Sequence, residues 1–205
     1  MFDLNGKDFQ ETTIFNDGKA GIAKNVTISV TKRQPGEPES NSPYKLIVRD
    51  KNGGLLTGWF NYPNAREGNS EEQNINAAKR DVSRVLHIAR AVVGSSYKFP
   101  DTTGMSPSKI IDVLFNIISE NAGDSKFNVY VNYGTKDYPN KKGYLGLRYF
   151  NFIEKTSEDG SSKLRDGAND LLVRIVADVD NAPKSDLDGL GDTIPTSSET
   201  DWTKL

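Results

Sequence analysis

Two short apolar segments on either side of an Asn-Gly pair constrain the fold of this chain more than any other feature. Residues 44–50 and 55–62 flank Asn52 and Gly53. An Asn-Gly pair readily adopts the positive φ that a tight hairpin turn requires. Just before this hairpin, residues 22–31 alternate apolar and polar side chains, which is the period of a half-buried strand. The sequence therefore predicts three strands in succession, the last two joined as a hairpin.

Helical periodicity follows the third strand. The sequence Ser70-Glu71-Glu72-Gln73 reads as a capping box, and apolar residues then recur every three or four positions up to Gly94. A second, shorter helix is predicted after Ser106, which suits an N-cap and is followed by proline at the first helical position. This second apolar pattern continues to Gly123.

Strand-like alternation returns in residues 127–133 and 145–153, which predicts a second strand pair. The apolar segment 171–176 fits a helix or a strand equally well. Five or six short strands interrupted by helices favour a mainly β, α+β fold that closes into a small barrel, because closure removes exposed sheet edges. The OB-fold is the candidate architecture. A generic α+β sheet with two helices on one face is the alternative.

Charge is distributed unevenly along the chain. Residues 178–205 hold seven acidic residues and two lysines. Because the whole chain has 26 Lys and Arg and 28 Asp and Glu, the first 177 residues hold 24 and 21. A body of net charge +3 thus precedes a tail of net charge −5. We predict one domain over residues 1–177, with a helical insertion at 70–121, followed by a flexible acidic tail over 178–205.

Several functional classes find no support in the composition. The chain has no cysteine, no apolar run long enough to span a bilayer and no secretory start, so we expect a cytoplasmic protein. No phosphate-binding glycine loop or nucleophile elbow is present, and His87, the one histidine, has no metal-ligand cluster around it in sequence. We therefore predict no cofactor, no metal site, no catalytic residue and no enzyme.

The strand pattern does predict a binding surface. If the apolar strand residues point inward, the other strand face becomes aromatic and basic, as single-strand binders require for base stacking and phosphate contact. A lysine-rich loop between the last two strands extends this face. The predicted nucleic-acid-binding residues are Lys45, Arg49, Trp59, Tyr130, Lys136, Tyr138, Lys141, Lys142, Tyr144, Arg148 and Phe150. The alternatives are that Trp59, Phe150 and Phe152 pack under the helices, and that the loop lysines are only solvated.

In layout, the chain resembles the phage-type single-stranded DNA-binding proteins. The resemblance rests on Met1-Phe2-Asp3-Leu4-Asn5, the strand 21–31, the hairpin from Tyr44, the segment 127–134 closing on 143–148, and the acidic tail. It implies an OB-fold core and a tail that docks replication or recombination proteins and competes with DNA for the basic groove. The tail residues that would take this part include Asp186, Asp188, Asp192, Asp201 and Trp202.

These patterns lead to one main functional hypothesis. We expect a non-catalytic protein that coats and protects single-stranded DNA in phage replication or recombination, in the cytoplasm of the host cell. A homo-oligomer is compatible with this hypothesis. The alternative is a structural or protein-interaction module, such as a virion accessory protein or an inhibitor, that uses the same sheet face for a protein partner.

Overall fold

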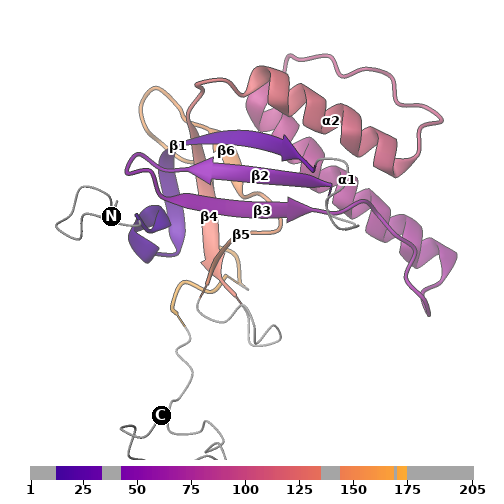
Figure 1. Cartoon of the computed structure of the whole chain (residues 1–205), viewed down its shortest axis with the longest axis horizontal. Coiled ribbons are helices and arrows are strands. Elements are labelled where there is room, and N and C mark those ends of the chain that lie inside the picture. The colour runs from indigo at the N-terminus through magenta and orange to yellow at the C-terminus, as the bar shows by residue number, and fades with distance from the viewer. Residues whose placement is uncertain (1–12, 34–42, 135–143, 169, 175–205) are drawn as a thin grey trace, which may run out of the picture. The chain divides into compact units, whose positions relative to one another are not determined.

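Strands and helices follow one another in three blocks along the chain (Figure 1). The structure is a computed structural model, and it describes residues 13–33, 43–134, 144–168 and 170–174. A short 3₁₀ turn, Phe15–Gly18, precedes the first strand. The elements are β1 (Gly21–Lys32), β2 (Tyr44–Arg49), β3 (Leu55–Phe60), α1 (Glu71–Val93), α2 (Pro107–Asn121), β4 (Phe127–Tyr133), β5 (Leu145–Leu147) and β6 (Ile153–Lys155).

All strand pairs are antiparallel and belong to one six-stranded sheet. The hydrogen-bonded order is β3-β2-β1-β4-β5, and β6 pairs with β4 beside β5. This arrangement confirms a mixed α+β fold. β3 and β5 stand at the two ends of the order, and no ladder joins them in the part of the chain that the structure describes.

β1 bends so that its two halves pair with different partners. Its first half pairs with β4 and its second half with β2, and the register shifts between Ala23 and Val26. Asn25, inside the shift, has a φ of 58°. Asparagine tolerates this left-handed conformation better than most residues, and one extra residue sharpens the local twist of a strand. The bend turns the sheet from the β1–β3 hairpins toward β4.

The predicted hairpin between β2 and β3 is confirmed, with an aspartate organising its turn. Gly53 has a φ of 88°, and the Asp50 N–H donates to the Gly54 carbonyl over 3.0 Å. The Asp50 carboxylate also accepts from the N–H groups of Asn52 and Gly54, at 2.9 and 2.8 Å. Side-chain capping of this kind satisfies turn amides that would otherwise lack a partner.

Both predicted helices are present with their predicted caps. At the start of α1, the Gln73 N–H donates to Ser70 Oγ over 3.2 Å, while the Ser70 N–H donates to Gln73 Oε1 over 2.8 Å. α1 ends at Gly94, whose φ is 83°. At the start of α2, the Lys109 N–H donates to Ser106 Oγ over 3.4 Å. Neither helix of the described residues is long and apolar enough to cross a membrane.

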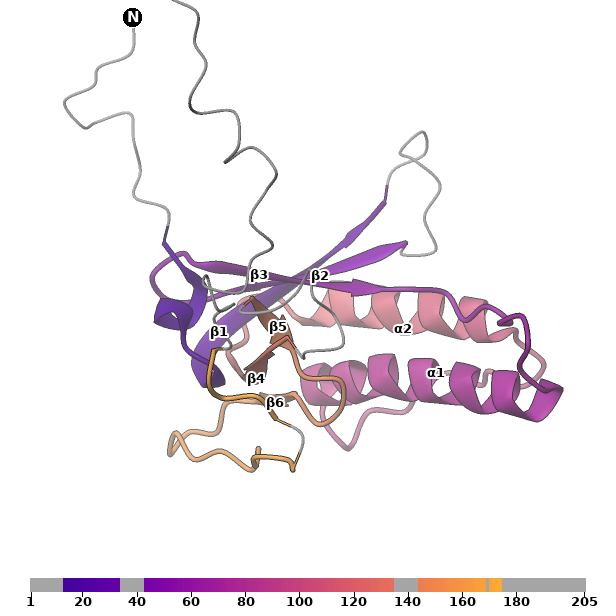
Figure 2. The ribbon, with the colours of Figure 1, turned by 90° about the horizontal axis from the view of Figure 1, so that it is seen from below.

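The helices lie together on one side of the β1–β3 hairpins, with α2 next to the strands (Figure 2). Phe115 of α2 is fully buried, stacks on Tyr44 at 4.3 Å between ring centroids, and meets Phe60 edge-on at 5.3 Å. α1 packs against α2 and against β6. Aromatic pairs at these distances bury large apolar areas, so this cluster fixes the helices against the sheet.

One predicted strand is wrong in its extent. Residues 145–153 do not form a single strand: β5 ends at Leu147, and β6 begins at Ile153. Asn151 between them has a φ of 48°, which breaks the extended conformation. β5 pairs with the second half of β4 and β6 with its first half. Of the segment 171–176, residues 171–174 are in neither helix nor strand.

The chain divides into two units, Met1–Ile175 and Val176–Leu205. The predicted boundary after residue 177 falls near this division. The second unit, and with it the predicted tail, lies outside the described residues.

Candidate functional site

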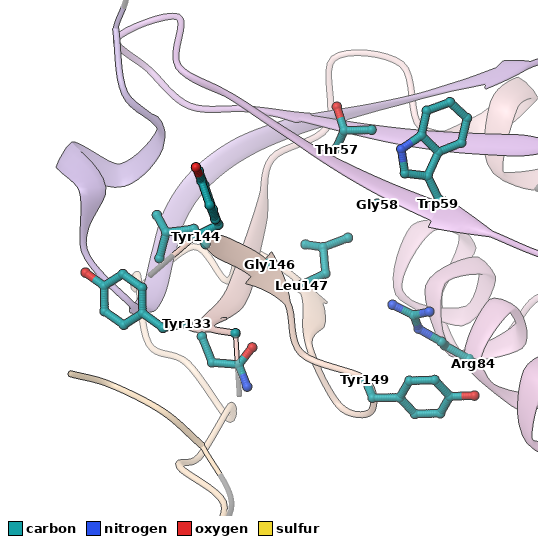
Figure 3. Close-up of a pocket in the computed structure, with 12 residues that line it drawn as sticks. Thr57, Gly58, Trp59, Arg84, Tyr133, Tyr144, Gly146, Leu147 and Tyr149 are labelled. Atoms are coloured by element: carbon teal, nitrogen blue, oxygen red, sulfur yellow. The ribbon is translucent and has the colours of Figure 1, made fainter. Parts of the chain in front are cut away.

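A groove of about 600 Å³ opens beside β3, between that strand and β5 (Figure 3). β3 supplies one wall and α1 contributes Arg84. The remaining residues come from the end of β4, from β5, from Gly134 and Tyr144 between these two strands, and from Tyr149 after β5. The lining residues include Thr57, Gly58, Trp59, Arg84, Tyr144, Leu147 and Tyr149. The groove therefore lies where the two ends of the strand order approach one another.

Contact between Gly58 and Leu147 brings the two strands together. A Cβ atom added to Gly58 would overlap Leu147 Cδ1. The absence of a side chain at position 58 thus lets the leucine of β5 lie directly against the β3 backbone. We call this contact the β3–β5 seam. It sets the floor of the groove beside Trp59.

The outer face of β2 and β3 is aromatic and basic, as predicted. Lys45 and Trp59 are cross-strand partners, and Lys45 Nζ lies 5.5 Å from the Trp59 ring centroid. The Arg33 guanidinium lies 5.4 Å from the same centroid. The Trp59 side chain is 49% exposed, and Arg49, on the same face of β2, is also exposed. Trp59 therefore does not pack under the helices.

Two further predicted aromatic residues are on the surface. Tyr144 is 69% exposed and lines the groove. Phe150 is 45% exposed and lies in the bend between β5 and β6, where it meets Tyr149 edge-on at 4.4 Å. Phe152, the third residue for which packing was the alternative, is fully buried.

Arg84 is the groove residue that the sequence analysis missed. It is half-buried, and its guanidinium lies 4.4 Å from the Phe60 ring centroid and 4.7 Å from that of Tyr149. Burial lowers the pKa of Arg84, although the neighbouring Tyr149 and Asp81 oppose that shift. In the sequence, Arg84 is one polar residue among others on an amphipathic helix. Its position on the helix between Asp81 and Val85 gave no sign that it faces a groove.

The expected exposure of Tyr130 is wrong. Tyr130 is fully buried, and its hydroxyl donates to Asp166 Oδ1 over 2.7 Å. Burial raises the pKa of Tyr130, and the hydrogen bond to Asp166 raises it further. The segment after β6 folds back and covers the β4 face to which Tyr130 belongs. A ring enclosed in this way is not accessible for base stacking.

Arg148 is held by the same segment. Its Nε lies 3.2 Å from Asp170 Oδ1, one of its terminal nitrogens donates to the Arg165 carbonyl over 2.6 Å, and its guanidinium lies 4.8 Å from the Tyr130 ring centroid. Its charge is thus balanced internally by a carboxylate. Arg148 as a phosphate contact stays a prediction.

Two groups of predicted residues lie outside the described part of the chain. The loop residues are Lys136, Tyr138, Lys141 and Lys142, and the tail residues are Asp186, Asp188, Asp192, Asp201 and Trp202. Both groups remain predictions. The described ends of the loop, Gly134 and Tyr144, both line the groove and are joined by a hydrogen bond of 3.1 Å from the Gly134 N–H to the Tyr144 carbonyl.

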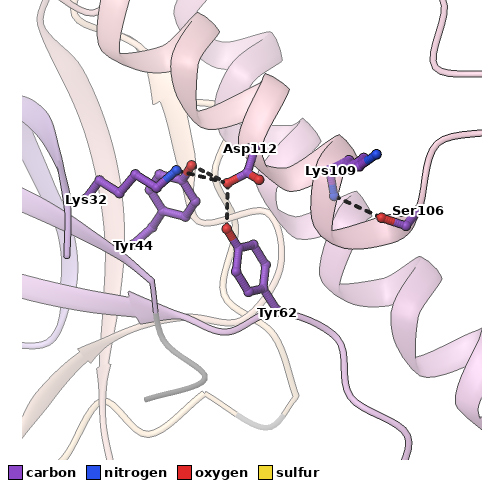
Figure 4. A network of polar contacts seen from close by, with 6 residues as sticks. All are labelled: Lys32, Tyr44, Tyr62, Ser106, Lys109 and Asp112. Atoms are coloured by element: carbon purple, nitrogen blue, oxygen red, sulfur yellow. Dashed lines mark hydrogen bonds and ion pairs between the residues drawn. The ribbon is translucent and has the colours of Figure 1, made fainter. Parts of the chain in front are cut away.

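A polar network around Asp112 of α2 joins this helix to the strands (Figure 4). Asp112 Oδ1 accepts from the hydroxyls of Tyr44 and Tyr62, at 2.5 and 2.6 Å, and lies 3.6 Å from Lys32 Nζ. Burial alone would raise the pKa of Asp112, but the two hydroxyls and the lysine together lower it. Burial, followed by the bond to Asp112, raises the pKa of Tyr62 to about 12. None of these four residues lines the groove, so we assign the network a role in stability.

Residue types needed for metal binding do not gather in the parts of the chain that the structure describes. No group of three or more His, Cys, Asp or Glu side chains there could hold a metal ion. His87 lies 6.0 Å from the Phe152 ring centroid, and burial lowers its pKa. It packs inside the fold and does not line the groove.

No protein-family model, curated protein or solved structure matches the chain.

Proposed function

We propose that this protein binds single-stranded DNA without catalysing a reaction, and that it coats and protects the strand during replication or recombination of a phage or related element in the host cytoplasm. The strand would lie across the outer face of β2 and β3 and along the groove beside β3. The acidic tail would recruit partner proteins.

The observation that carries this proposal is the environment of Trp59. Its half-exposed ring has two cationic groups within 5.5 Å of its centroid, those of Lys45 and Arg33, and it stands at the edge of a groove that also presents Tyr144. Unpaired bases stack on exposed aromatic rings, while lysine and arginine beside them contact the phosphates. Trp59 and its two neighbouring cations therefore provide a ring for base stacking and charges for phosphate contact at the same place.

The strand order supports the finer assignment of an OB-fold. β1, β2 and β3 form a meander, β4 pairs with the free edge of β1, β5 follows as its hairpin partner, and the helices lie between β3 and β4. The bend at Asn25 lets β1 pair with both β2 and β4, and the β3–β5 seam brings the two ends of the strand order together. In the OB-fold, the face of strands 2 and 3 and the loops 1–2 and 4–5 bind oligonucleotides. Lys45 and Trp59 occupy that face here.

A protein-interaction module is the second candidate, and a different surface favours it. An apolar crevice between the first half of α1 and the first turn of α2 is lined by Ile75, Ala78, Val82, Pro107 and Ile110 among others. Ile75 is 46% exposed. An exposed apolar crevice of this kind suits a protein contact, and nucleic acid would find no cation-flanked aromatic ring there.

Alanine substitutions on the full chain test the DNA proposal. Trp59→Ala and Tyr144→Ala should each weaken binding of a labelled oligo-dT by about 10- to 100-fold, because one stacked base is worth about 1 to 3 kcal/mol. Fluorescence anisotropy titrations measure the dissociation constants, and thermal melting checks that each variant folds.

Tyr97→Ala is the matched control, since Tyr97 is also an exposed tyrosine, 38% exposed, and lines a separate crevice with Phe99. It should leave the affinity unchanged. If folded Trp59→Ala and Tyr144→Ala variants bind as the control does, the β2–β3 face is not the DNA-binding surface. A wild type that binds no oligo-dT would favour the protein-interaction candidate.

A further inference from the structure

We propose that Arg84 forms an anion subsite in the groove, where it holds one backbone phosphate of the bound strand. This inference rests on the proposed function and adds a residue from α1 to a surface otherwise made of strands. Figure 3 shows the Arg84 side chain reaching from α1 toward the space between Trp59, Leu147 and Tyr149.

Aromatic rings hold the guanidinium in place. Its carbon lies 4.4, 4.7 and 5.6 Å from the ring centroids of Phe60, Tyr149 and Phe152. The Tyr149 hydroxyl in turn donates to Asp81 Oδ1 over 2.7 Å, so the ring beside Arg84 is itself fixed to α1. Rings that cover the faces of a guanidinium leave its N–H edge for a ligand. The cation is therefore positioned before any ligand arrives.

Asp81 lies close enough to Arg84 to oppose the lowering of its pKa, but no ion pair joins the two side chains. Among the described residues, Arg84 makes no ion pair within 4.0 Å, and its buried Nε has no hydrogen-bond partner. Asp81, one turn earlier on α1, accepts from Tyr149. A half-buried cation without a bonded anion is unfavourable, and arginine stays protonated under such conditions. Arg148 shows the contrast, because Asp170 balances it. A phosphate would supply the paired anion that Arg84 lacks among the described residues.

The surroundings favour a phosphate that belongs to a nucleic-acid strand. Trp59 and Tyr144 line the same groove and expose their rings at 49% and 69%. A strand whose bases stack on these rings would carry its phosphodiesters past the groove floor between them. A guanidinium binds a phosphate through two parallel hydrogen bonds, and the desolvated floor strengthens that contact.

The test uses full-length Arg84→Met, which removes the charge and keeps an unbranched apolar stem among the rings. Each protein is titrated with labelled oligo-dT across a series of salt concentrations. Loss of one phosphate contact should flatten the slope of log affinity against log salt by about 0.7, and weaken binding by about tenfold at the lowest salt. Arg90→Met is the matched control, since Arg90 is an exposed arginine on the same helix and does not line the groove. It should leave the slope unchanged.

Thermal melting accompanies each variant, because Arg84 packs on three rings. If Arg84→Met does not fold, Arg84→Lys replaces it: the charge remains and the paired hydrogen bonds are lost, so the slope should stay as in the wild type while affinity falls several-fold. The subsite is refuted if Arg84→Met has the slope of Arg90→Met, or if Arg84→Lys binds as tightly as the wild type. A wild type that binds no oligo-dT at any salt would instead refute the proposed function, and the subsite with it.

Discussion

At the scale of single residues, Asp112 joins more elements than any other polar group described above. One carboxylate oxygen accepts from Tyr44 on β2 and from Tyr62 just after β3, and it faces Lys32 at the end of β1. Hydrogen bonds to a charged group stabilise a fold by about 1.5 to 3 kcal/mol, and a hydroxyl left unpaired adds a desolvation cost. The attachment of α2 to the strands should therefore depend on this one side chain.

Replacing Asp112 by alanine should lower the free energy of unfolding by about 2 kcal/mol, as measured by urea denaturation. Asp124→Ala is the control, because Asp124 is an exposed aspartate just beyond α2. It should change stability by less than about 0.5 kcal/mol. Equal stability of the two variants would mean that the network does not hold α2 in place.

The pH dependence of stability follows from the same groups. The pKa of Asp112 is lowered in the folded state, so its contribution is present above the ordinary value of 3.8 and is lost as pH falls through the lower, folded value. The pKa of Tyr62 is raised from 10.0 to about 12, so its contribution is present below pH 10 and is lost as pH rises toward 12. Asp112→Ala should flatten both limbs of the stability profile. Wild-type limbs in the variant would contradict these assignments.

The sequence predicted the exposed side chains correctly on β2 and β3 but not on β4. Lys45, Arg49 and Trp59 follow the alternation of a sheet with one covered face, so period two places them correctly. Tyr130 fails because both faces of β4 are covered, the second by the segment that holds Asp166. That segment is polar and without periodicity, so nothing in the sequence shows that it folds back. Arg84 was missed for the same kind of reason, since only the three-dimensional position of α1 brings it to the groove.

At the scale of elements, local chemistry determined most boundaries. The Asn-Gly turn, the capping box at Ser70 and the Ser106-Pro107 start each act over a few residues, and the structure has all three. The bend of β1 at Asn25 and the break at Asn151 depend on which strands pair with which, so periodicity alone did not reveal them. At both places an asparagine has a positive φ, and asparagine within a strand-like pattern is a sequence signal for such an irregularity.

The β3–β5 seam can be tested by adding one methyl group. Gly58→Ala should lower the free energy of unfolding by about 1 to 2 kcal/mol, because its Cβ would overlap Leu147 and force that side chain to move. The double variant Gly58→Ala, Leu147→Ala should lose less than the sum of the two single changes.

Gly146→Ala on β5 is the control for the seam, since a Cβ there meets nothing within 4 Å. It should be neutral or slightly stabilising, because alanine restricts the unfolded chain. Strict additivity of the Gly58 and Leu147 substitutions would show that the two strands do not press together at this point.

At the scale of the whole molecule, the charge asymmetry makes a prediction of its own. Deleting residues 178–205 removes a net charge of −5 and leaves a body of +3. Binding of oligo-dT should tighten, chiefly at low salt, and the gain should fade as the Debye length shortens from about 30 Å at 0.01 M to about 10 Å at 0.1 M. Melting should change little, because a segment rich in Gly, Ser, Asp and Pro has too little apolar surface to offset the entropy lost on ordering. Weaker binding after truncation would contradict competition between tail and DNA.

Single-strand binding is measured most directly by titrating the intact protein with single-stranded and duplex DNA of equal length. We would use labelled oligo-dT longer than roughly 16 nucleotides and the matching duplex, each at about 0.05 and 0.2 M salt. We expect tight binding of the single strand, which should weaken about tenfold or more between the two salts. The duplex should bind much more weakly, because its bases are not free to stack on Trp59 and Tyr144. Equal affinity for both forms, or no binding of either, would contradict the proposed function.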